Sequence, residues 1–181
     1  MGVFSGIVKR WLGENEGVTA IEFSLLATPF VFIAIGIIEL SMMFVANSLL
    51  LGAVDDAARA IRTGQVQQAS GETSLQAFQN ALCQTSGILL DCSQMQYQVQ
   101  TIDDFSDADM SKPQVDKNGN LIAEPFDPGS SGSVVLIRVV YLYPLMTPMI
   151  GQFFSDYPGN KKMLMATVVI ENEPYSDSSG G

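Results

Sequence analysis

Few residues in this sequence have the types and spacing that catalysis needs. The 181 residues include no histidine, which is the commonest general base in enzymes. The serines have no identifiable base, and the stretch Gly129-Ser-Ser-Gly132 has the composition of a linker and not the pattern of a phosphate-binding loop. We therefore predict neither an enzyme nor a cofactor site.

The two cysteines, Cys83 and Cys92, are separated by eight residues. In an oxidising compartment they would pair, and closing so short a loop contributes about 2–3 kcal/mol on the chain-entropy estimate. The alternative is two independent small buried residues. A zinc site is not expected, because two cysteines without a histidine rarely complete four ligands.

A cluster of aspartates occupies positions 103, 104, 107 and 109. Carboxylate oxygens are the ligands that Ca²⁺ prefers. This stretch lacks the spacing and the closing glutamate of the common calcium loop, so an acidic surface loop is the favoured interpretation.

Two further carboxylates, Glu22 and Glu39, each directly precede a long apolar stretch of the sequence. No charged residue occurs from Phe23 to Ile38, directly after Glu22, and none from Leu40 to Val54, directly after Glu39. Apolar segments of this length predict a membrane-spanning helix. Glu39 would lie some 24 Å along that helix from Phe23, near the outer boundary of the bilayer. There it either reaches water or contacts another subunit, since intramembrane carboxylates usually have partners.

One long helix, predicted over Val18–Arg62, must position these residues. It would measure about 68 Å, of which Phe23–Met43 suffices to cross a hydrocarbon core of about 30 Å. Pro29 predicts a kink or local melting inside the span, and Gly64 is expected to end the helix. The second half is amphipathic, with one apolar face formed by Leu50, Val54, Ala57 and Ile61.

Short motifs mark this helix and the C-terminal part of the chain. They are Gly17-Val-Thr-Ala-Ile-Glu22-Phe23, Pro29, Gly36-Ile-Ile-Glu39, Ala57-Ala-Arg59-Ala-Ile-Arg62-Thr-Gly64, Tyr143-Pro-Leu-Met-Thr-Pro148 and Glu171-Asn-Glu-Pro-Tyr175. In these motifs the sequence resembles the TadE-type minor pilins, or pseudopilins, of the tight-adherence (Flp-type) pilus system. Family members often have tyrosine after the glutamate, where this chain has Phe23. Residues 65–133 carry no motif that we assign to the family.

The resemblance implies that a prepilin peptidase cuts between Gly17 and Val18, which makes Glu22 the fifth residue of the mature chain. In a pilus, a glutamate at this position, here followed by Phe23, is expected to neutralise the N-terminal amine of a neighbouring subunit. An unpaired charge in lipid is costly, and pairing offsets much of that cost. The alternative is a carboxylate that merely sits at the headgroup level. A cut after Gly13 would place Val18, and no glutamate, at the fifth position.

A secretory signal peptide is the competing interpretation of the N-terminal region. Ala58-Arg59-Ala60 offers a cut site for signal peptidase. The apolar region before it has roughly 30 residues, against about 7–15 in a cleaved signal. An anchor that stays on the protein is therefore favoured.

The charges predict the partners and the orientation. A net charge of −10, from 19 acidic and 9 basic residues, argues against nucleic acid. Lys9 and Arg10 precede the span and predict a cytoplasmic N-terminus, whereas Arg59 and Arg62 beyond it argue weakly for the opposite orientation. The expected location is the inner membrane, in a single pass, with the C-terminal domain periplasmic or extracellular.

The exported part is predicted to be an α+β domain without repeats, in which an antiparallel sheet packs with a second helix. We expect a helix over Thr73–Thr85 and strands over Met95–Ile102, Ser133–Tyr143 and Lys162–Asn172. A polar, turn-rich stretch covers 103–132, with a tight turn at Asn118-Gly119. The apolar stretch Pro144–Phe154 is broken by prolines and predicts a short helix or loop on the sheet. The predicted parts are thus a leader (1–17), a membrane and spine helix (18–64) and an exported domain (65–181).

These expectations favour a minor pilin of a tight-adherence pilus. Its partners would be the lipid bilayer, other pilins of the same pilus, the prepilin peptidase and the inner-membrane assembly machinery. The runner-up is an uncleaved single-pass protein whose periplasmic domain binds a partner, and a membrane-tethered enzyme ranks third.

Overall fold

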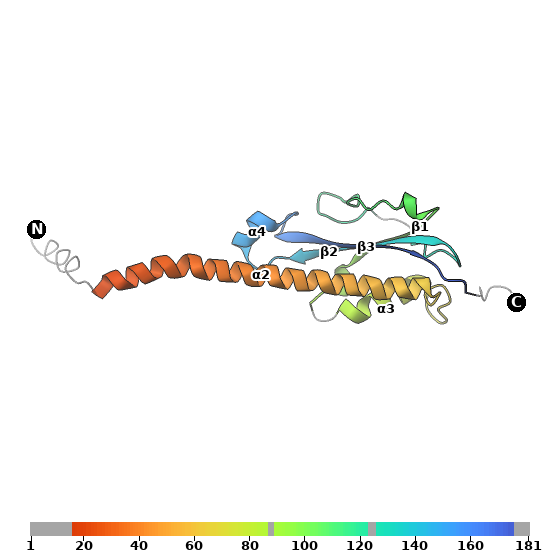
Figure 1. Ribbon diagram of the computed structural model, residues 1–181, viewed down its shortest axis with the longest axis horizontal. Coiled ribbons are helices and arrows are strands. Elements are labelled where there is room, and N and C mark those ends of the chain that lie inside the picture. Colours follow the sequence, from red (N-terminus) through yellow and green to blue (C-terminus); the bar gives the residue numbers. More distant parts are fainter. Residues whose placement is uncertain (1–15, 87–88, 123–125, 176–181) are drawn as a thin grey trace, which may run out of the picture. The chain divides into compact units, whose positions relative to one another are not determined.

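The computed structural model describes residues 16–86, 89–122 and 126–175. The chain divides into two compact units, Met1–Leu40 and Ser41–Gly181, and helix α2 (Glu16–Arg62) contributes to both. The second unit contains a three-stranded antiparallel sheet with further helices (Figure 1). The predicted α+β class with a long N-terminal helix is confirmed.

In the first unit, α2 is apolar on every side and its apolar side chains are exposed. Phe23, Leu26 and Phe30 are each more than 70% exposed. Within the described residues, α2 is the one helix long and apolar enough to cross a membrane, with a mean hydropathy of 2.2 over its best window. A helix that is hydrophobic all round is typical of a membrane span or of burial among other helices.

Polar groups inside this apolar part of α2 bond to its own backbone. The Ser24 hydroxyl donates to the Ala20 carbonyl at 2.8 Å, and the Thr28 hydroxyl donates to the Ser24 carbonyl at 2.8 Å. Such bonds leave no hydroxyl unsatisfied in lipid. The local melting considered at Pro29 does not occur, since α2 runs through it without a break.

In the second unit, one face of α2 forms a wall of the core. Its inward-facing side chains lie at helical spacing and are nearly inaccessible to solvent: Ala46, Leu50, Ala53, Val54, Ala57, Ala58 and Ile61. Four of these seven are alanines, and all seven belong to the same core cluster as alternate residues of the sheet. The amphipathic face predicted from the sequence is confirmed.

The end of α2 is built as a Schellman motif. The N–H of Gly64 donates to the carbonyl of Ile61, and the N–H of Gln65 donates to the carbonyl of Ala60, both at 3.0 Å. Gly64 has a φ of 76°, which favours glycine, and the ring of Tyr175 lies where a Cβ would be. The predicted helix end is confirmed.

The sheet has the order β1-β2-β3, formed by β1 (Gln96–Ile102), β2 (Val134–Pro144) and β3 (Lys161–Glu171). Both neighbouring pairs are antiparallel, with Val99 opposite Ile137 and Ile137 opposite Val168. β2 is the central strand and is buried along nearly its whole length. All three strands lie within two residues of their predicted bounds.

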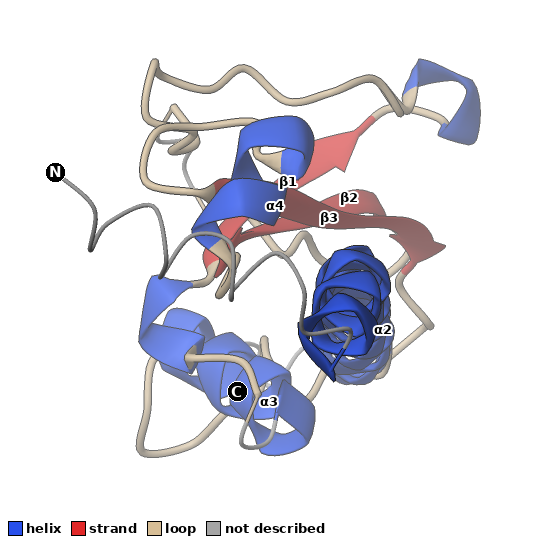
Figure 2. Ribbon diagram, turned by 90° about the vertical axis from the view of Figure 1, so that its left-hand side faces the viewer, coloured by secondary structure: helices blue, strands red, loops and turns tan. Residues whose placement is uncertain are grey.

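The two faces of the sheet are covered differently (Figure 2). Alternate residues of β2 pack with α2 and α3 in the main core: Val135, Ile137, Val139, Tyr141 and Tyr143. The residues between them face the other side, which is covered by the chain between β1 and β2: Leu136, Arg138, Val140 and Leu142. Burial on both faces explains why the sequence of β2 is continuously apolar and does not alternate between apolar and polar residues.

Helix α3 (Ser74–Ser86) has the capping arrangement that its first residues predict. The backbone N–H of Gln76 donates to the Thr73 hydroxyl at 3.2 Å, and the N–H of Thr73 donates to the Gln76 side chain at 2.9 Å. These reciprocal bonds form a capping box. The buried face of α3 places Phe78 in edge contact with Tyr97 of β1, with ring centroids 5.3 Å apart.

Between β2 and β3 lies α4 (Pro148–Phe154), the short helix expected from the proline-broken apolar stretch. After β3, the chain returns to the end of α2. The N–H of Glu173 donates to the Arg62 carbonyl at 2.9 Å, and their side chains form an ion pair at 3.3 Å. The segment up to Tyr175 is therefore attached to the spine, whereas the sequence indicated only a polar tail from Pro174.

Candidate functional site

The predicted processing junction lies at the start of the described chain. Helix α2 begins at Glu16, so the Gly17–Val18 peptide bond belongs to its first turn. The rest of the predicted leader, residues 1–15, lies outside the described residues. The structure thus gives the backbone conformation at the junction but does not test cleavage there.

Glu22 and Phe23 follow this junction on α2 and both are exposed, Phe23 to 73%. Removing seventeen residues would leave Glu22 within the first turn and a half of the shortened helix. There the partial positive charge of the helix N-terminus and the new amine both favour a carboxylate. The predicted pairing with a neighbouring subunit needs that exposure, but no second subunit is present to test it.

Glu39 is the one buried carboxylate in the described part of the chain, at 5% exposure. A side chain buried this far has little surface for water and equally little for another subunit. Both interpretations drawn from the sequence, contact with water and contact with another subunit, stay untested predictions.

Cys83, in the last turn of α3, and Cys92, the first residue of the short helix η1 (Cys92–Gln94), form a disulfide with a Cα–Cα distance of 5.7 Å. The bond joins the end of α3 to the start of β1, two elements that pack in the same core. The cysteines therefore have a structural role, and no thiol remains free in the chain.

The aspartates at 103–109 mostly serve their own loop. Asp104 caps the short helix η2 (Phe105–Asp107) by accepting a bond from the Ser106 N–H at 2.8 Å, and this bond lowers the pKa of Asp104. Asp109 accepts from the Ser111 N–H, and hydrogen bonds from Ser111 lower its pKa as well. Within the described residues, no three potential metal-ligating side chains converge.

Arg138 lies in β2, within the strand predicted over Ser133–Tyr143, and the sequence indicated no partner for it. The structure shows it 4% exposed, on the sheet face that the 103–132 segment covers. Its guanidinium donates to the Gln98 side chain at 3.0 Å, to the Ser111 carbonyl at 3.3 Å and to the Asp109 carbonyl. Arg138 thereby fixes the covering segment to the sheet.

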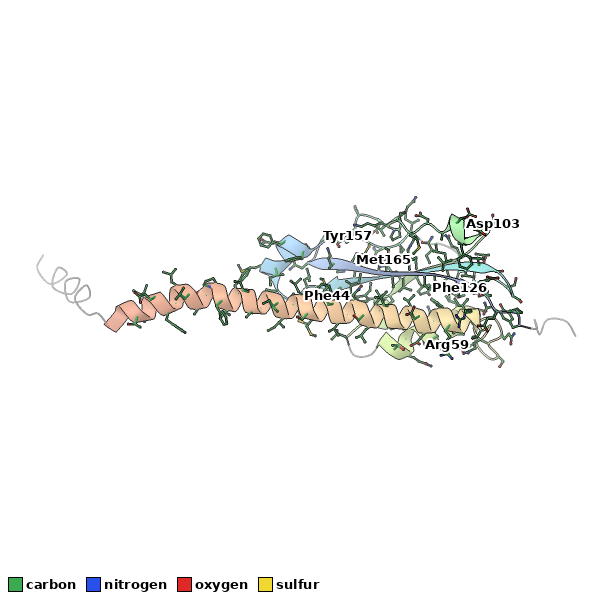
Figure 3. All side chains as sticks on the ribbon, viewed as in Figure 1. Phe44, Arg59, Asp103, Phe126, Tyr157 and Met165 are labelled. Atoms are coloured by element: carbon green, nitrogen blue, oxygen red, sulfur yellow. A yellow bond between two sulfur atoms is a disulfide. The ribbon has the colours of Figure 1, made fainter. Side chains whose placement is uncertain are left out.

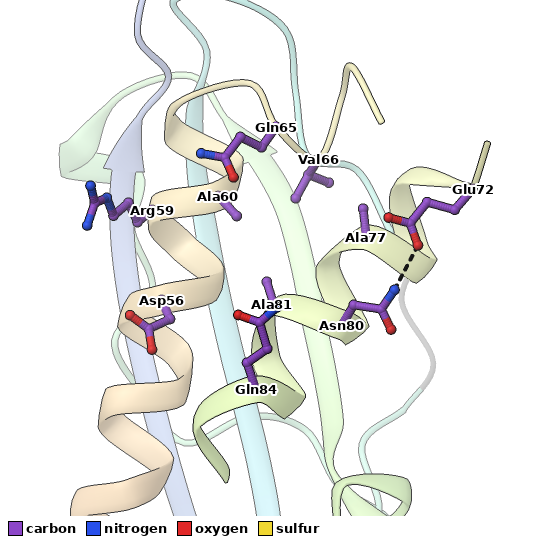
Figure 4. A pocket seen from close by; sticks show the side chains of 10 residues that line it. All are labelled: Asp56, Arg59, Ala60, Gln65, Val66, Glu72, Ala77, Asn80, Ala81 and Gln84. Atoms are coloured by element: carbon purple, nitrogen blue, oxygen red, sulfur yellow. Dashed lines mark hydrogen bonds between the residues drawn. The ribbon is translucent and has the colours of Figure 1, made fainter. Parts of the chain in front are cut away.

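A shallow polar cavity of about 440 Å³ lies between α2 and α3, lined by side chains of both helices and of the turn that follows α2 (Figure 4). Asp56 is hydrogen-bonded to the Thr85 hydroxyl, and Glu72 to Asn80 at 2.7 Å. The first bond joins α2 to α3, whereas the second lies between α3 and the residues just before it. The side chains that line the cavity include no nucleophile paired with a base. We assign no chemistry to this cavity.

One family model matches the N-terminal segment of the chain. Residues 17–59 match the family model described as TadE-like protein. This match starts at Gly17 and includes Glu22, Phe23 and Glu39, and it agrees with a pilin-type protein of the tight-adherence system. Searches of curated proteins and of solved structures found no match.

Proposed function

We propose that this chain is a minor pilin, or pseudopilin, that takes part in assembling a tight-adherence pilus. One observation carries the proposal: the TadE-like match begins at Gly17, the residue before the expected cut, and covers the apolar helix. The family is one of structural subunits, which agrees with the lack of an evident catalytic group in the sequence. Adhesion or secretion would be the process that the pilus supports.

In this proposal the chain inserts with its N-terminus in the cytoplasm, and the prepilin peptidase removes residues 1–17. The mature helix then exchanges lipid for the helices of other pilins. Its exposed apolar side chains suit either environment, since both are apolar. Glu22 pairs with the amine of a neighbour, and Phe23 packs beside it.

The same structure fits a second candidate, an uncleaved single-pass protein with a partner-binding periplasmic domain. Both candidates need the membrane anchor and the folded second unit. They differ at the Gly17–Val18 bond alone, so the test is made there.

We expect the mature protein to begin at Val18 in cells that contain the prepilin peptidase, as read by N-terminal sequencing and intact mass. Gly17→Phe should block the cut, because the peptidase must approach the backbone closely at this residue. Gly13→Phe is the matched control and should be processed normally.

A start at Ile61 would mean a secreted soluble domain, and an intact Met1 in the unaltered chain would favour the single-pass candidate. Either result would discard the pilin proposal.

A further inference from the structure

Helix α4 and the loop before it display apolar side chains on the surface of the second unit. Met146, Met149, Phe153 and Phe154 are 75%, 60%, 79% and 42% exposed, and we call these four residues the α4 apolar surface. The opposite side of the same segment is fixed in the fold, since Leu145 is 6% and Ile150 is 4% exposed. The segment is therefore held in place while its largest apolar groups face outward.

This surface lies at one particular end of the second unit. α4 is at the end of the sheet nearest Phe44 of α2, which is itself 65% exposed (Figure 3). The second unit begins at Ser41, which follows the apolar first part of α2 directly. The predicted span ends at Met43. The end that carries α4 is thus the end at which the chain would enter the membrane.

The charges beside α4 fit a membrane surface. The chain as a whole has 19 acidic and 9 basic residues, but residues 144–162 contain two lysines, Lys161 and Lys162, and one acid, Asp156. Asp156 is paired with Lys162 at 2.9 Å, which leaves a local excess of one positive charge. Apolar side chains flanked by lysines are typical of segments that lie in the bilayer interface next to anionic headgroups.

We propose that the α4 apolar surface inserts into the interfacial layer of the membrane, on the side where the second unit lies. The chain would then contact lipid at two places, through the spanning helix and through α4. This double contact would fix how the second unit is oriented on the membrane. The inference rests on the membrane anchoring in the proposed function, but not on leader cleavage or on pilus assembly.

A lipid surface is favoured over a protein partner by the size of the surface. A stable protein interface buries about 800 Å² on each side. Four side chains around a seven-residue helix offer much less than that by themselves. Insertion into a lipid interface needs no matching partner surface. Its free energy becomes more favourable with each apolar side chain that leaves water.

The test uses tryptophan fluorescence in the full chain. Its single tryptophan, Trp11, is first changed to phenylalanine. Phe153→Trp or, as a second probe, Met149→Trp is then introduced, both at exposed positions that tolerate a larger ring. The matched control is Phe105→Trp in η2, a residue that is also exposed, at 51%. It follows Asp103, which lies at the far end of the sheet from α4 (Figure 3).

Each variant is reconstituted into phosphatidylethanolamine–phosphatidylglycerol vesicles, and flotation verifies that the chain is membrane-bound. We expect lipids brominated near the headgroup to quench most of the emission from positions 153 and 149, with emission shifted to the blue. Emission from position 105 should be unchanged by these lipids and quenched by aqueous iodide.

Three results would overturn the inference. If the chain floats but the α4 probes respond like position 105, α4 does not contact lipid. The membrane anchoring by α2 would then be supported while this inference fails. If the α4 probes are shielded from iodide yet are not quenched by brominated lipid, a second protein copy covers them. If the chain does not float, the membrane anchor itself is wrong and this inference fails with it.

Discussion

At the scale of single residues, Glu22 and Arg138 illustrate opposite uses of charge. Glu22 is exposed near the start of an apolar helix, where the charge of the helix N-terminus favours a carboxylate, and the amine proposed to pair with it belongs to another subunit. Arg138 is buried, and it joins Gln98 of β1 to the carbonyls of Asp109 and Ser111 in the segment that covers the sheet. The role of Glu22 therefore has to be sought in an assembly, and that of Arg138 within the fold.

We predict that Glu22→Ala leaves membrane insertion intact but strongly reduces incorporation into pili. The charge lies just outside the run that drives insertion, while its proposed partner exists only between subunits. Complementation of a deletion strain should be scored separately for pili and for membrane-bound subunit. Glu14→Ala, a carboxylate removed with the leader, is the control. Normal pili that contain the Glu22→Ala subunit would remove the assigned role.

For Arg138→Met, we predict a free energy of unfolding lower by about 2 kcal/mol, because two loop carbonyls and the Gln98 amide oxygen lose their charged donor. The covering segment should also open more often, which trypsin reports by faster cleavage after the exposed Lys117. Arg59→Met alters an exposed arginine and serves as the control. Unchanged cleavage at Lys117 would mean that Arg138 does not hold the segment.

At the scale of elements, the connection from α3 to β1 is fixed at both of its ends. The disulfide joins the last turn of α3 to the residues before β1, and Asp91 caps η1 by accepting from the Ser93 N–H at 3.0 Å. The packing of Phe78 against Tyr97 connects the same two elements through the core. Cross-link, cap and ring contact all favour the same placement of α3.

We expect the double variant Cys83→Ser and Cys92→Ser to fold but to lose about 2–3 kcal/mol of stability, because the unfolded chain is no longer restrained by the loop. Urea unfolding in detergent, followed by circular dichroism, measures the loss, and reduction of the unaltered chain should reproduce it. Peptide mapping without reductant should recover the linked pair. Full alkylation of both thiols in native, unreduced protein would contradict the prediction.

For the molecule as a whole, the net charge is −10. The pKa values of several of its aspartates are lowered in the folded state. Hydrogen bonds within tight turns lower the pKa of four aspartates in the second unit, Asp91, Asp104, Asp109 and Asp116. For Asp116 the largest cause is the bond from the Asn120 N–H, at 2.8 Å. The folded second unit therefore binds fewer protons at these groups than the unfolded chain.

A lowered pKa in the folded state gives a stabilisation that is complete above the unfolded value and disappears as the pH falls through the folded value. We predict that the urea midpoint of the full chain in detergent is steady from pH 7 to about pH 5 and falls below about pH 4. Asp116→Asn keeps an oxygen acceptor but does not titrate, so its midpoint should depend less on pH. A midpoint that is constant or rises on acidification would show that relief of charge repulsion dominates.

Features that depend on patterns within a few residues could be predicted from the amino-acid sequence alone. The uncharged run from Phe23 to Ile38 requires an apolar helix, and Gly64 ends that helix because only a residue that accepts positive φ suits its last turn. The helix expected over Thr73–Thr85, the strand over Ser133–Tyr143 and the turn at Asn118-Gly119 likewise follow from spacing within a few residues. In these places the local preference and the final structure agree.

The contacts between segments far apart in the chain could not be predicted from the sequence and are seen in the folded structure. Arg138 binds carbonyls 27 and 29 residues before it, and Glu173 returns to Arg62 at the end of the spine. Whether Phe153 points into the core or away from it was also not readable from the apolar stretch 144–154. The periodicity of a sequence shows which residues of one helix or strand lie on the same face. It does not show which distant part of the chain packs against that face after folding.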